Sequence, residues 1–116
     1  MRFVCLHHTD WGQAHWDFML EQHQSLATWK LYHDPTQLLE ESLELFSIAD
    51  HRKWYLAYEG PVSDSRGHVR RFDTGEYELL KKNSQLWQVR LNGQVLSGEF
   101  EIRLIEDDRW LCTHCR

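Results

Sequence analysis

Residues 14–22 read AHWDFMLEQ, and two kinds of side chain alternate along this segment. In an extended strand, successive side chains leave opposite faces, so residues two apart lie on the same side. One side carries apolar groups that we expect in the core: Trp16, Phe18 and Leu20. The other side carries mostly polar groups: His15, Asp17, Met19 and Glu21. The pattern predicts a strand with one face in the core and one face available for chemistry.

His8 follows a first strand predicted over residues 2–6 and precedes His15 by a short loop. With Asp17, these residues would place two imidazoles and a carboxylate on one surface. Such a ligand set leaves several coordination positions of a divalent metal open for substrate. However, eight histidines in 116 residues will often place two near an aspartate. Spacing alone leaves a metal site and a surface or hydrogen-bonded histidine pair as equal interpretations.

Short strands separated by turn signals about every ten residues continue along the chain. They are predicted over residues 26–31, 45–50, 54–58, 69–72, 76–80, 87–91, 96–104 and 110–113. Asp34-Pro35-Thr36-Gln37 has the capping pattern of a helix start, and this short helix should end near Leu43. Asn92-Gly93 predicts a type I′ turn within a hairpin.

This arrangement favours a mainly β fold, a small antiparallel β-barrel, closed or nearly closed, of about eight strands with one short helix. Hydrophobic residues make up 41% of the chain and aromatic residues 13%. That content is enough for one compact domain over residues 1–116, with aromatic side chains filling the small barrel.

Charge and segment composition limit the functions of the chain. The formal net charge of -5 gives no general attraction to nucleic acid, so a polynucleotide would have to be bound by local contacts. No apolar run approaches the roughly 18 residues that span a membrane. The N-terminus lacks a signal-peptide pattern, and we expect a cytoplasmic protein.

The three cysteines are Cys5, Cys112 and Cys115. An odd count without a secretion signal disfavours a disulfide framework. Cys112 and Cys115 have the spacing of a metal knuckle, but no second pair exists, and residues three apart in a strand face opposite sides. The pattern disfavours a structural zinc there.

A series of motifs runs in order from Phe3 to Leu111. It comprises FVCLHH at 3–8, HWDFMLE at 15–21, LATW at 26–29, DHRKWYLAYEG at 50–60, FDTG at 72–75, LNGQVLSGEF at 91–100 and WL at 110–111. The series resembles the 3′-phosphoesterase domain of bacterial DNA ligase D, which also exists as a free-standing protein. We therefore expect a divergent, free-standing member of that family.

The resemblance implies a site built from five residues of this chain. By position, His8, His15 and Asp17 would bind a divalent metal, with Mn²⁺ as the candidate. His51 and Tyr55 would be the catalytic residues at the scissile phosphate. Since Tyr55 is four residues beyond His51, we expect it to leave its strand on the same side.

Three further residues are predicted to contact substrate: Glu21, His33 and Arg52. Domains of this family clean nucleic-acid ends, removing a 3′-terminal ribonucleotide and then a 3′-phosphate to leave a 3′-hydroxyl for ligation. The resemblance implies the same DNA repair function, with nucleic-acid 3′ ends as substrates. A separate DNA ligase is a candidate partner, and we expect a monomer.

The chain departs from the family at basic positions. Met19 stands where the family has an Arg, His33 where it has a Lys, and Leu43 where it has another Arg. At Met19, a thioether thus replaces a planar group able to bind phosphate through two hydrogen bonds. Basic residues that could substitute, although a solvated surface role is simpler for each, are Lys30, Arg52, Lys53, Arg70 and Arg71.

Three functions remain open. The first is a metal-dependent phosphoesterase acting on nucleic-acid 3′ ends, and the second is a phosphoesterase for a smaller or differently charged phosphate. The third is a non-catalytic relative that binds a metal or a protein partner. Retention of the three metal ligands with His51 and Tyr55 favours an enzyme, because folding alone does not require this set.

Overall fold

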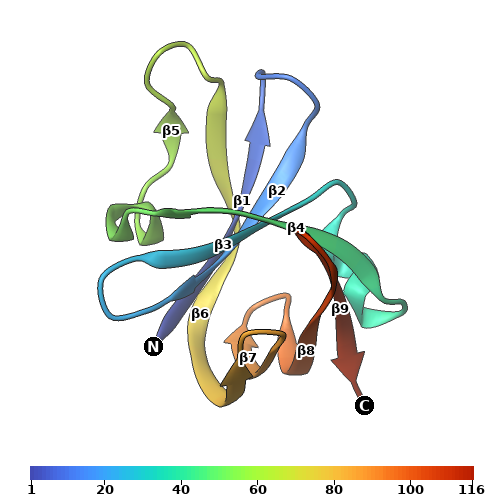
Figure 1. Cartoon of the computed structure of the whole chain (residues 1–116). Coiled ribbons are helices and arrows are strands. Elements are labelled where there is room, and N and C mark those ends of the chain that lie inside the picture. Colours follow the sequence, from blue (N-terminus) through green and yellow to red (C-terminus); the bar gives the residue numbers. More distant parts are fainter.

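The computed structural model describes residues 1–116 as nine β-strands and two short 3-10 helices (Figure 1). In chain order the elements are β1 (Arg2–Thr9), β2 (His15–Glu21), β3 (Leu26–Leu31), η1 (Pro35–Leu39), β4 (Leu43–His51), η2 (Lys53–Leu56), β5 (Gly60–Pro61), β6 (His68–Asn83), β7 (Leu86–Gly93), β8 (Ser97–Glu106) and β9 (Arg109–Cys115). None of the helices has the length and apolar character needed to span a membrane.

Eight of the strands form a ring of antiparallel neighbours. Their order is β1-β2-β3-β4-β9-β8-β7-β6, and β6 pairs with β1 to complete the ring. The β4–β9 junction consists of four residue pairs, from Leu43↔Cys112 to Phe46↔Arg109. The short strand β5 pairs with the start of β6. The predicted mainly β, closed or nearly closed antiparallel barrel of about eight strands is confirmed.

The interior of the ring holds a cluster of 19 buried residues, which we call the ring core. Much of the aromatic content lies there. Trp29 makes T-shaped contacts with Trp87 and Trp110, with ring centroids 5.3 and 5.8 Å apart. Phe18 and Leu20 of β2 also belong to the ring core, as the alternation in this strand predicts.

A second, smaller cluster lies on the other face of β1, β2 and β3, and we call it the outer cluster. Its members are Val4, Leu6, Met19, Leu26, Leu56 and Val69. Residues 52–67, which contain η2 and β5, connect β4 to β6 and contribute to this cluster from outside the ring (Figure 1). As a result, β2 is largely buried on both faces.

The helix predicted at Asp34 is present but shorter than expected. The Asp34 carboxylate accepts a hydrogen bond from the Thr36 backbone nitrogen at 2.9 Å, which fixes its start. It ends at Leu39 rather than near Leu43, because Leu43 already lies in β4 and packs in the ring core. The strand predicted over residues 54–58 is wrong. These residues form η2 and the following turn, and Leu56 packs in the outer cluster.

The predicted type I′ turn at Asn92-Gly93 is also wrong. Strand β7 runs through both residues, neither has a positive φ, and the chain reverses over residues 94–96. The buried Asp73 carboxylate accepts hydrogen bonds from the backbone nitrogens of Gln94 at 2.9 Å and Leu96 at 2.7 Å. This contact from a distant strand moves the turn beyond its local signal.

Candidate active site

Cross-strand pairing brings the three predicted metal ligands together on the outer face of the ring. His8 lies directly opposite His15 in the β1–β2 ladder. Asp17 is two residues beyond His15 and therefore leaves β2 on the same side. The three residues are 7%, 4% and 3% exposed, respectively. They extend the outer cluster as a buried polar group.

The ligand atoms of His8, His15 and Asp17 all lie within 4.8 Å of one another. His8 Nδ1 is 3.5 Å from Asp17 Oδ2, and His15 Nε2 is 3.3 Å from Asp17 Oδ1. Asp17 Oδ1 is buried and has no hydrogen-bond partner. A buried carboxylate oxygen in this state is costly unless a nearby cation compensates its charge.

The second nitrogen of each imidazole is anchored to a backbone carbonyl. His8 Nε2 donates to the Arg66 carbonyl at 2.6 Å, and His15 Nδ1 donates to the Gln13 carbonyl at 2.9 Å. In a neutral imidazole, the other nitrogen then carries a lone pair. Both lone pairs face the Asp17 carboxylate, which is a repulsive arrangement without a positive charge between them. Because metal-binding histidines are held in this way, the donor set fits a divalent metal.

Electrostatic interactions keep Asp17 ionised. Burial raises its pKa, but when the facing nitrogens of His15 and His8 carry protons, their hydrogen bonds and positive charge outweigh burial and lower the pKa of Asp17 to about 2. The Asp17 carboxylate in turn raises the pKa of His8, and burial opposes this change. A proton on His8 therefore competes with a metal for the same position.

The three ligands line a cavity of about 290 Å³, which we call the outer cavity, and His51 and Tyr55 line it too. The rings of His51 and Tyr55 are 5.5 Å apart at an interplanar angle of 69°. His51 is the last residue of β4, and its Nδ1 donates to the Ala49 carbonyl at 3.0 Å. The other ring nitrogen, Nε2, is not used in this hydrogen bond. Tyr55 lies on η2, so the predicted common strand is wrong, although both side chains line the same cavity.

Comparison with known families identifies the relationship of this chain. The family model described as the DNA ligase D 3′-phosphoesterase domain matches residues 6–103, a range that contains the five residues just described. The chain belongs to this family. The resemblance carried by the ordered motifs is thereby confirmed. No curated protein matches the chain.

In this 3′-phosphoesterase domain, the three predicted substrate contacts lie outside the outer cavity. Glu21 is at the far end of β2, where its carboxylate accepts from the Arg2 backbone nitrogen at 2.8 Å and pairs with Lys53 at 3.5 Å. His33 and Arg52 are exposed. Their contacts with substrate stay predictions.

The outer cavity of the phosphoesterase domain also has lining residues that were not predicted, and Trp11 and Arg66 are two of them. Trp11 is 47% exposed, and its ring centroid is 5.5 Å from that of His8. Trp11 lies between the candidate ligands His8 and His15 in the sequence, and this position could have indicated that it is near the site. Arg66 carries no such signal, because its place depends on the path of residues 52–67. Among the proposed substitute cations, Lys30 lines the cavity.

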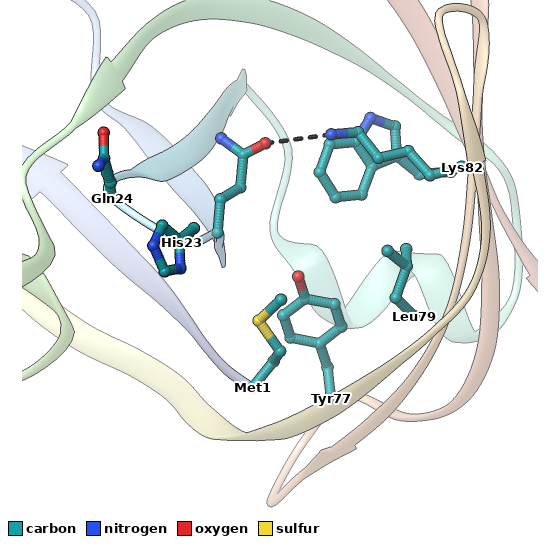
Figure 2. A pocket seen from close by; sticks show the side chains of 8 residues that line it. Met1, His23, Gln24, Tyr77, Leu79 and Lys82 are labelled. Atoms are coloured by element: carbon teal, nitrogen blue, oxygen red, sulfur yellow. Dashed lines mark hydrogen bonds between the residues drawn. The ribbon is translucent and has the colours of Figure 1, made fainter.

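A separate hollow of the phosphoesterase domain lies at the other end of β2 (Figure 2). There Lys82 Nζ donates to Gln22 Oε1 at 3.2 Å and lies 4.4 Å from the Trp87 ring centroid. The hollow is lined by none of the predicted catalytic, metal-binding or substrate-binding residues. The candidate chemistry of the domain is therefore concentrated in the outer cavity.

Proposed function

We propose that this protein is a metal-dependent 3′-phosphoesterase that trims nucleic-acid ends. It removes a 3′-terminal ribonucleotide and a 3′-phosphate, leaving a 3′-hydroxyl that a separate DNA ligase can join. Family membership supports phosphoester hydrolysis on 3′ ends. The observation that carries the proposal is that His8, His15 and Asp17 share one cavity with His51 and Tyr55.

His8, His15 and Asp17 would hold the metal, and Mn²⁺ is the proposed ion. A bound divalent ion neutralises phosphate charge and lowers the pKa of a coordinated water. The ionised Asp17 carboxylate and the anchored imidazoles give this chain a ligand set that is already oriented. Little conformational cost would then accompany metal binding.

His51 and Tyr55 are proposed to act on the phosphate itself. The hydrogen bond from His51 Nδ1 to Ala49 fixes the ring and leaves Nε2 for the substrate. In its protonated form, Nε2 can donate to a phosphate oxygen or transfer a proton to the leaving oxygen. The Tyr55 hydroxyl is proposed to donate a hydrogen bond to a second phosphate oxygen.

One observation favours the two other candidate functions. Met19, which stands at the position of the family Arg, is 1% exposed and belongs to the outer cluster. With the net charge of -5, this substitution favours a smaller or differently charged phosphate substrate, or a relative that binds without catalysis. One domain over residues 1–116, a monomeric state and a cytoplasmic location stay predictions.

The proposal is tested with purified protein, Mn²⁺ and a primer-template that ends in a 3′-phosphate or a 3′-ribonucleotide. We expect the wild type to produce a 3′-hydroxyl end and His15→Ala to lose this activity. The control is His23→Ala, which removes an exposed histidine at the opposite end of β2. Absence of activity at micromolar wild-type protein would refute the end-trimming function. Activity that survives both a chelator and His15→Ala would refute metal dependence.

A further inference from the structure

Lys30 occupies a distinct place in the outer cavity. In the β2–β3 ladder it lies directly opposite Asp17. Directly opposed residues of antiparallel strands project from the same face, with Cβ atoms about 5 Å apart. Lys30 is half-buried and lines the cavity that Asp17, His51 and Tyr55 also line. The Lys30 side chain therefore forms part of the wall of the candidate site.

The Lys30 side chain has no acidic partner. The ten ion pairs of the protein do not include it, even though Asp17 is its neighbour across the ladder. The other Lys or Arg that lines this cavity is Arg66. Its guanidinium donates to the Ser63 carbonyl at 2.8 Å and to the Ser63 hydroxyl at 3.1 Å.

A phosphate in this cavity would need a local positive charge beyond that of a bound metal. The protein as a whole is acidic, and the buried thioether of Met19 provides no charge on this face. A lysine presents its charge on a flexible stem with three donors, so it can follow phosphate oxygens without the fixed fork of an arginine. Lys30 is the cavity-lining cation that is free to do this.

We propose that Lys30 binds the non-bridging oxygens of the substrate phosphate and replaces the charge missing at Met19. This inference rests on the proposed function, since it adds a substrate-binding residue to the same cavity. It also makes the substrate preference of this chain depend on β3, whereas position 19 lies on β2.

The kinetic test compares Lys30→Ala and Lys30→Arg with the control Lys81→Ala, which removes an exposed lysine of β6. The substrate is a 3′-phosphate primer-template with saturating Mn²⁺. Loss of a charged hydrogen bond should raise KM by about 10-fold or more in Lys30→Ala. Lys30→Arg should recover most of this loss, and Lys81→Ala should match the wild type. If the KM of Lys30→Ala stays within about 2-fold of wild type, well below the expected ~10-fold rise, the proposal is overturned.

A binding test separates this inference from the proposed function. Inorganic phosphate is titrated into the Mn²⁺-loaded wild type and Lys30→Ala, followed by NMR or calorimetry. Weaker phosphate binding by Lys30→Ala supports the role of Lys30 even if the wild type proves inactive on 3′ ends. If the wild type is active on 3′ ends but Lys30→Ala binds phosphate as tightly as the wild type, the role of Lys30 is overturned and the proposed function is not. A loss of Mn²⁺ binding or of folded structure in both Lys30→Ala and Lys30→Arg would also overturn it, since Lys30 would then support the ligands or the fold.

Discussion

The inner and outer faces of β1, β2 and β3 differ in what their side chains do. The inner face contributes residues such as Phe3 and Trp29 to the 19-residue ring core. The outer face contributes to a cluster of only six buried residues, beside which His8, His15 and Asp17 face a cavity. Strand alternation thus assigns most of the packing to one face and the candidate chemistry to the other. Substitutions on the two faces should therefore have separable effects on stability and activity.

The largest effect is expected on the inner face, for Trp29→Ala. Trp29 is 3% exposed and contacts two other tryptophans, so its removal leaves a cavity that the surrounding ring cannot fill. We expect the free energy of unfolding to fall by about 3–5 kcal/mol, measured by urea denaturation. Any molecules that remain folded should still bind Mn²⁺. Loss of the metal site without loss of stability would contradict the separation of the two faces.

An intermediate effect is expected from metal binding on the outer face. Mn²⁺ at about 100 times its Kd should raise the free energy of unfolding by about 2.7 kcal/mol, because the unfolded chain does not assemble the ligands. Asp17→Asn should abolish this increase while the protein stays folded. Thermal unfolding with and without Mn²⁺ measures both. An equal increase in the wild type and Asp17→Asn would place the metal elsewhere.

The metal effect should also depend on pH in a defined direction. Asp17 raises the pKa of His8, so a proton stays on His8 to a higher pH than on an ordinary histidine. Metal binding must displace that proton, and the apparent Mn²⁺ affinity should therefore rise with pH through the titration of His8 and then level off. Calorimetry in buffers of different ionisation enthalpy measures the released proton. An affinity that is constant through this range would contradict the role of His8 as a ligand.

The smallest effect is expected for Met19→Leu in the outer cluster. The two side chains have similar volume, and such exchanges usually cost less than about 1.5 kcal/mol. Because the buried Met19 thioether carries no charge for the phosphate, 3′-phosphatase activity should stay within 2-fold of wild type, well below the ~10-fold effect of a lost charged hydrogen bond. A much larger loss of activity with normal stability would show that the sulfur contacts the reacting groups. Met19 would then belong to the chemistry of the outer face and not to its packing.

Much of the strand pattern and the clustering of His8, His15 and Asp17 could be predicted from sequence, because both depend largely on strand alternation. His15 and Asp17 are two apart on one strand, and pairing with β1 brings His8 opposite His15. The path of residues 52–67 could not be predicted in this way. Tyr55 reaches the cavity from a 3-10 helix, and Arg66 reaches His8 from a loop 58 residues away in sequence.

The turn after β7 could not be predicted from local sequence either, although it lies within the ring. Asn92-Gly93 is a strong local hairpin signal, but the Asp73 carboxylate binds the backbone nitrogens of Gln94 and Leu96. These hydrogen bonds come from β6 and outweigh the preference of two residues for a tight turn. Sequence patterns located most of the strands, whereas contacts between distant segments decided where this connection reverses.

Residues 52–67 connect β4 to β6 and form one wall of the outer cavity. This segment provides Tyr55 and the carbonyl that orients His8, yet all 19 residues of the ring core lie in other parts of the chain. Replacing this segment between His51 and His68 would remove Tyr55 and Leu56 and the carbonyl that orients His8, while every residue of the ring core stays in place. The wall of the outer cavity can therefore change separately from the ring core, whereas the packing of Leu56 in the outer cluster changes with it.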